Sequence, residues 1–108
     1  MEVSSYDENN TLIVVPSGKL DTLNAPEFGK ILSNLLNEKP SACFLDMSKV
    51  SFLASSGLQV LLAGAKISKR DGINFGVFGM DEMVEDVFIM SGFNNFIPSF
   101  VSKEEALA

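Results

Sequence analysis

The pattern of apolar and polar positions changes its period several times along this chain, and each change marks a predicted element. Residues 11–15 are β-branched and apolar, which favours a strand, and residues 2–7 can pair with them as a hairpin. Apolar side chains then recur at helical spacing. We expect this helix to begin at Asn24 as a capping residue and to end before Pro40. Pro16, which has no N–H to give to a ladder, should lie at a strand end or edge.

The rest of the chain alternates strands with helices. Residues 42–47 are almost entirely apolar, as expected for a central strand covered on both faces, and residues 49–53 should connect it to a helix. That helix starts in Ser55-Ser56-Gly57 and stops at Gly72, which suits a left-handed end. The remaining predicted elements are a strand over 73–78, a helix capped by Asp81 and ended by Gly92, a strand over 96–101, and a short helix from Ser102.

The predicted order of elements is ββαβαβαβα. Strands that alternate with helices indicate an α/β fold with a mostly parallel sheet, here of about five strands, and right-handed crossovers. An antiparallel first hairpin would make this sheet mixed. The chain has 108 residues and no linker or repeat, so we expect one domain over residues 1–108.

The charge balance limits the kind of partner. The chain carries 14 acidic and 8 basic residues, for a formal net charge of −6. Nucleic acids and anionic membranes are repelled by such a surface, so we expect neither as a partner, and a basic patch on a protein is favoured. The chain shows neither a signal peptide nor an apolar run near the ~20 residues of a membrane span, so we expect a cytoplasmic location.

The inventory of reactive side chains argues against an enzyme. The chain has no histidine, which excludes Cys/His zinc sites and Ser-His-Asp or Cys-His nucleophiles. Its one cysteine, Cys43, lies in an apolar run and is expected in the core. Asp46 ends a strand but lacks the acidic companions of a phospho-acceptor site. We therefore predict no metal and no cofactor. We expect Met83 and Met90 to be packing residues and Phe96 to lie in the core, with an exposed partner contact as the alternative for Phe96.

The most informative segment precedes the second helix. Ser56 and Gln59 have the spacing of a capping box, which makes Ser56 the expected helix cap and leaves Ser55 one position outside the helix. A phosphate on Ser55 would lie beside free N–H groups at the positive end of the helix. It would add about −1.5 to −2 charges. The alternative is that the serine doublet is only a helix start.

Four segments of the chain together resemble a known family. Phe52-Leu53-Ala54-Ser55-Ser56-Gly57-Leu58 is similar to the signature of STAS domains, in which a hydrophobic turn ends in Asp-Ser-Ser/Thr/Ala-Gly-Leu before an amphipathic helix. Gly18-Lys19-Leu20-Asp21, Leu45-Asp46-Met47-Ser48-Lys49-Val50 and Met90-Ser91-Gly92-Phe93 resemble three further motifs of that family, in the same order. The resemblance therefore covers essentially the whole chain.

The resemblance implies a STAS-like fold and an anti-sigma factor antagonist. In that family the unphosphorylated protein binds an anti-sigma factor that is also a serine kinase, and a sigma factor is released. The kinase holds the ATP and phosphorylates the serine that matches Ser55, while a PP2C-type phosphatase removes the phosphate. This chain would then be a substrate of the kinase and not an enzyme. We expect it to be a monomer or weak dimer. The resemblance places partner contacts at Asp21, Ala54, Ser55, Ser56, Gly57 and Leu58.

One position departs from the family pattern. Ala54 stands where the family has an aspartate before the phosphorylated serine. The alternative function that this substitution favours is a STAS scaffold or transporter-associated interaction module that is never phosphorylated. Asp21 could supply a carboxylate beside the same helix start, or it could be a turn residue that satisfies backbone amides.

Overall fold

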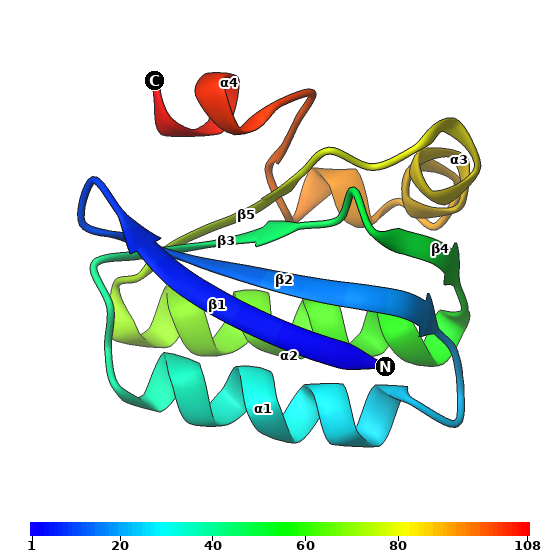
Figure 1. Cartoon of the computed structure of the whole chain (residues 1–108), viewed down its shortest axis with the longest axis horizontal. Helices are drawn as coiled ribbons and strands as arrows, with labels where there is room; N and C mark the ends of the chain where they lie inside the picture. Colours follow the sequence, from blue (N-terminus) through cyan, green and yellow to red (C-terminus); the bar gives the residue numbers. More distant parts are fainter.

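A six-stranded mixed sheet forms the middle layer of the structure, a computed structural model that describes residues 1–108 (Figure 1). The strands are β1 (Glu2–Glu8), β2 (Thr11–Leu20), β3 (Ala42–Asp46), β4 (Val50–Leu53), β5 (Asn74–Phe78) and β6 (Ser99–Phe100). The helices are α1 (Ala25–Asn37), α2 (Ser55–Asp71), α3 (Glu82–Met90) and α4 (Lys103–Leu107), with a short 3-10 helix, η1, at Phe93–Asn95. The strand order is β1-β2-β3-β5-β6, and β4 pairs with β2 outside this path.

The only antiparallel pair is the first hairpin, and every other pair of strands is parallel. Glu8 pairs with Thr11, so the connection between β1 and β2 has two residues. Asn9 and Asn10 both have positive φ, 54° and 62°. This backbone conformation is the one that a two-residue hairpin with right-handed strand twist requires, and asparagine tolerates it. The predicted mixed, mostly parallel sheet is confirmed.

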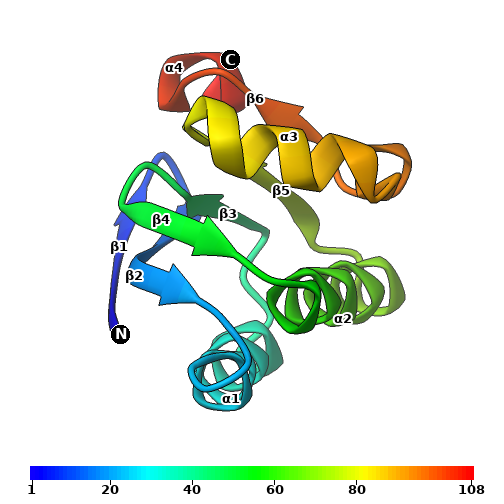
Figure 2. The same ribbon diagram turned by 90° about the vertical axis from the view of Figure 1, so that its right-hand side faces the viewer.

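Helices cover both faces of the sheet. α1 and α2 pack side by side on one face, while α3, η1 and α4 lie on the other (Figures 1 and 2). The first face carries most of the main core, where Phe28, Leu32 and Leu36 of α1 are each at most 1 % exposed. The second face is closed near the hairpin by a smaller cluster: Ile13, Val15, Phe44, Phe78 and Ala106. No helix in the structure combines the length and the apolar character needed to cross a lipid bilayer.

β2 changes its parallel neighbour part of the way along its length. Its residues 11–14 pair with β3, whereas its residues 18–20 pair with β4. Pro16 lies between these two segments, in the middle of the strand and buried, so the expectation of a strand end or edge was wrong. The missing N–H is tolerated there because no parallel partner residue faces Pro16.

Two further strand predictions needed correction. Residues 50–53 form β4 and not a connection, because Val50 and Leu53 bury their side chains while pairing with the extended end of β2. The last strand is limited to Ser99–Phe100, because a turn follows η1 as far as Ile97, whose N–H donates to the Phe93 carbonyl at 2.9 Å. The sheet thus has one strand more than predicted.

The helix ends show where local sequence decides the outcome. Asp81 caps α3, since its Oδ1 accepts from the N–H of Val84 at 2.8 Å, and Gly72 ends α2 in the left-handed region with φ 71°. Both predictions are confirmed. Asn24 stands at the start of α1 but does not cap it, because its side-chain amide donates to the Lys19 carbonyl at 2.8 Å.

Candidate functional site

The end of β4 leads directly into α2, on the side of the molecule shown in Figure 2. The N–H of Ala54 donates to the Leu20 carbonyl at 3.0 Å, which ties this connection to the end of β2. The N–H of Leu58 donates to the Ala54 carbonyl at 3.0 Å and forms the first hydrogen bond of the helix. Figure 2 shows the starting ends of α1 and α2 and the outer side of α3 on the same face.

The expected cap of α2 was wrong. The capping position is Ala54, with an extended backbone (φ −93°, ψ 169°), and no side chain bonds the first amides of the helix. Ser56 lies inside the first turn, and its hydroxyl donates to the hydroxyl of Thr22 at 3.3 Å. Gln59 therefore has no capping-box partner. The helix starts two residues earlier than predicted, and Ser55 lies inside it, because the hydrogen bond between Ala54 and Leu20 fixes where β4 ends.

Ser55 is the first residue of α2 and its side chain is exposed. The amides of residues 55–57 precede the first hydrogen bond of the helix, so they have no carbonyl partner within it. Ala54 has no side-chain oxygen that could accept from them. An anionic group on Ser55 would therefore find unpaired N–H donors and the positive end of the helix dipole close by.

Gly57 and Leu58 are buried, and we expect them to hold Ser55 in place rather than to contact a partner. A Cβ atom on Gly57 would lie 2.6 Å from the Leu20 carbonyl oxygen and 2.8 Å from Leu20 Cγ. Only glycine therefore allows α2 to begin this close to β2. Leu58 is 5 % exposed and belongs to the main core.

Asp21 serves the turn between β2 and α1. Its Oδ1 accepts from the N–H of Asn24 at 3.0 Å, and its carbonyl accepts from the N–H of Ala25 at 2.9 Å. The reading of Asp21 as a turn residue is therefore confirmed. The bond between Thr22 and Ser56 brings this turn beside the first turn of α2, so Asp21 lies in the turn next to the helix start that carries Ser55.

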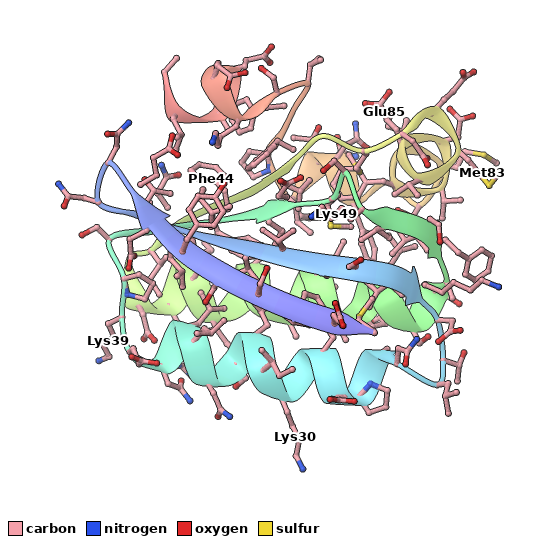
Figure 3. All side chains as sticks on the ribbon, in the orientation of Figure 1. Lys30, Lys39, Phe44, Lys49, Met83 and Glu85 are labelled. Atoms are coloured by element: carbon pink, nitrogen blue, oxygen red, sulfur yellow. The ribbon has the colours of Figure 1, made fainter.

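Sequence reasoning missed three exposed apolar side chains on this face. Leu23 in the turn before α1 is 84 % exposed, Phe52 on β4 is 45 % exposed, and Met83 on α3 is 66 % exposed. Figure 3 shows Met83 pointing outward on the side where β4 ends. We call these three residues the apolar rim. Met83 was expected in the core because sequence spacing gives no sign of which side of a short helix faces outward, and Phe52 lay in a predicted connection.

The reactive groups elsewhere offer no second chemical site. Burial raises the pKa of the Cys43 thiol to about 12, so it is a packing residue, as predicted. No cluster of acidic, cysteine or histidine side chains could hold a metal ion. The exposed Ser55 hydroxyl, its unpaired amides and the apolar rim are therefore the candidate site.

Comparisons with known proteins identify relatives along the whole chain. The sequence model of the STAS domain matches residues 2–106. An anti-sigma-F factor antagonist, RsfB of Mycobacterium tuberculosis, is 26 % identical over 106 residues, which are 97 % of this chain and 85 % of that protein.

Solved structures show the same fold. An anti-sigma factor antagonist from Mycobacterium paratuberculosis superposes with a TM-score of 0.90 and 24 % identity, over 98 % of this chain and 90 % of that one. The anti-sigma factor antagonist SpoIIAA in its unphosphorylated form superposes with a TM-score of 0.80 and 18 % identity, over 98 % and 93 % of the two chains.

Proposed function

This chain belongs to the STAS domain family, and we propose that it is an anti-sigma factor antagonist whose contact with its partner is switched by phosphorylation of Ser55. The observation that carries the proposal is the position of Ser55. Its hydroxyl is exposed, lies at the first residue of α2, and stands among unpaired helix amides on the face that carries the apolar rim. A relative that spans nearly the whole chain bears the name of an anti-sigma factor antagonist.

In the unphosphorylated state the face around Ser55 suits a protein contact. Leu23, Phe52 and Met83 offer apolar surface that a partner would remove from water, at about 25 cal/mol per Å² buried. The neutral hydroxyl of Ser55 loses little on burial if it finds one hydrogen-bond partner. The acidic character of the chain favours a partner whose rim is basic.

Phosphorylation would reverse this contact. The partner kinase would transfer the γ-phosphoryl group of its own ATP to the Ser55 oxygen, with loss of the hydroxyl proton and release of ADP. The new group adds about −1.5 to −2 charges to this face. A buried, poorly paired charge costs several kcal/mol, and each ~1.4 kcal/mol weakens binding tenfold. A PP2C-type phosphatase would hydrolyse the ester and restore the neutral surface.

Ala54 bears on how the phosphate would be held. An aspartate at this capping position would accept from the same first-turn amides that a phosphate on Ser55 needs. Alanine leaves those amides free for the phosphate, so the substitution is compatible with a phosphorylated state. The same substitution also supports a second candidate function. If the family's aspartate orients the serine hydroxyl for the kinase, its loss favours a scaffold or transporter-associated module that binds without a switch.

A capture experiment separates the two functions. The wild type, Ser55→Asp and Ser55→Ala are used as baits in lysate of the source organism, and partners are identified by mass spectrometry. We expect the wild type and Ser55→Ala to retain a kinase-like anti-sigma factor that Ser55→Asp loses. Circular dichroism spectra should be the same for all three baits.

The captured kinase then tests the modification directly. With ATP, we expect the wild type and Ser56→Ala to gain one phosphoryl group, located on Ser55 by fragmentation, while Ser55→Ala gains none. Equal capture by Ser55→Asp together with no phosphorylation of the wild type would contradict the switch and favour the scaffold.

A further inference from the structure

A groove lies along the second half of α2, well away from Ser55. It has a volume of about 470 Å³. Its lining residues are Leu62, Ala65, Lys66 and Lys69 of α2, together with Asn95 and Phe96 at the end of η1. The two walls are therefore α2 and the segment that follows α3. At a rise of about 1.5 Å per residue, Lys66 lies ~16 Å along the helix axis from Ser55, so the groove is a separate site.

The charges of this groove are unusual for this chain. Lys66 and Lys69 are exposed and three residues apart, which places them on the same side of α2. Neither is within ion-pair distance of a carboxylate, because the two salt bridges of the chain join Arg70 to Asp71 and Lys103 to Glu8. Two unpaired cations therefore flank one groove on a protein whose net charge is −6.

The other wall of the groove presents an aromatic ring to solvent. Phe96 is 69 % exposed, while its neighbour Ile97 is 1 % exposed and anchors the segment in the core. The N–H groups of both residues donate to the Phe93 carbonyl at 2.9 Å, which fixes the backbone that carries the ring. Packing of the fold leaves Phe96 outside, contrary to the expectation that it belongs to the core. A ring held in water beside Leu62 and Ala65 is a surface that a ligand can cover.

We propose that this groove binds a small amphipathic organic anion. Its apolar part, an aromatic ring or short acyl chain, would lie on Phe96, Leu62 and Ala65. Its carboxylate or sulfonate would lie between the ammonium groups of Lys66 and Lys69, and the side-chain amide of Asn95 could donate to it. The volume falls within the ~300–1,000 Å³ of small-molecule sites, which combine apolar walls with a few convergent polar groups. Charge complementarity selects an anion over a cation.

The test uses 1-anilinonaphthalene-8-sulfonate as the probe, followed by fluorescence and by amide chemical shifts of the labelled chain. We expect saturable binding with shift changes confined to the second half of α2 and to η1. Lys66→Glu should weaken binding about tenfold, which corresponds to ~1.4 kcal/mol. Lys30→Glu is the matched control: it makes the same charge change within α1, where the side chain points away from the sheet (Figure 3), and binding should change less than twofold.

A second variant addresses the apolar wall. Phe96→Ala removes an exposed ring, so the fold should be retained while the probe binds several-fold more weakly. Equal affinity of the wild type, Lys66→Glu and Phe96→Ala would overturn the proposal, as would shift changes centred on another surface. Binding of an acidic peptide in the groove without binding of the probe or of octanoate would also overturn it, because the site would then be a protein-docking groove. None of these measurements involves Ser55 or a kinase, so the result is independent of the proposed switch.

Discussion

The hydroxyl of Ser56 donates to the hydroxyl of Thr22 at 3.3 Å and joins the first turn of α2 to the turn before α1. These two turns carry Leu23 and Ser55, two of the residues that we propose as a partner-binding face. Ser55 lies next to one end of this bond and Leu23 next to the other. The face is therefore assembled from segments that are distant in sequence.

Gly57→Ala should destabilise the protein. The new Cβ would lie 2.6 Å from the Leu20 carbonyl oxygen, so α2 or β2 must shift. Overpacking of this kind lowers the free energy of unfolding by about 1–3 kcal/mol. Urea denaturation of the variant and the wild type measures this difference. Gly29→Ala is the control, because its Cβ would be 3.4 Å from the nearest side-chain atom within a helix, where alanine is favoured. Equal stability of Gly57→Ala and the wild type would show that the helix start is not fixed by this contact.

Ala54→Asp should stabilise the fold by supplying the missing cap of α2. A capping side chain is worth about 1 kcal/mol, or a rise in Tm of roughly 4–8 °C for a domain of this size. Ala54→Asn provides the same hydrogen bond without the charge and should give a similar gain. If the amides at the start of α2 also hold the phosphate, phosphorylated Ala54→Asp should gain less thermal stability from its phosphate than the phosphorylated wild type. An unchanged Tm for both variants would contradict the capping argument.

Polar substitutions in the apolar rim should weaken partner binding while stability is kept. Leu23→Ser and Met83→Gln remove apolar surface that is 84 % and 66 % exposed in the free protein. Burial of such a side chain is worth about 1.5–3 kcal/mol, so each variant should lower affinity for the captured partner at least tenfold by calorimetry. Val101→Ser, at a side chain that is 78 % exposed beyond the sheet, serves as the control and should bind normally. A uniform effect of all three would mean that the rim is not the contact.

The buried thiol should make stability fall at alkaline pH. The pKa of Cys43 is raised by burial from 9.0 to about 12, so the folded state keeps its proton over a range in which the unfolded state loses it. The contribution of the protonated thiol to the free energy of unfolding is fully present below pH 9.0 and is lost as the pH rises toward 12. Over this range the free energy of unfolding falls by at most about 1.4 kcal/mol per pH unit. Urea denaturation between pH 8 and pH 11 should show a shallower decline for Cys43→Ala than for the wild type. Parallel slopes would mean that the thiol is solvated in the folded state.

Local sequence patterns predicted those features that local interactions decide. The cap at Asp81, the left-handed end at Gly72 and the apolar stripe of α1 each depend on residues within a few positions of one another. The cap of α2 was mispredicted because Ser56 and Gln59 have the right spacing, yet a hydrogen bond from Ala54 to the distant Leu20 sets the helix start. Tertiary pairing prevailed over a local motif there.

Exposure was the other feature that sequence could not supply. β4 was missed because Val50 and Leu53 become buried only when β2 continues past its pairing with β3. Met83 and Phe96 are apolar, and their spacing does not reveal which side of a short helix or turn will be left uncovered. The motif predicted Ser55 beside the start of α2, although Ser55 is the first residue of the helix and not one position outside it. The exposure of the apolar rim could be seen only in the packed structure.

Pro16 has a consequence for the uniqueness of this fold. If β2 had amide donors along its whole length, β3 and β4 could form overlapping hydrogen-bond ladders with it. The two strands would then compete for the same stretch of β2. The imino acid interrupts that row where the change of neighbour occurs, which disfavours a parallel ladder that runs across Pro16. The proline thereby favours the pairing that places β4 beside the end of β2 and Ser55 at the start of α2.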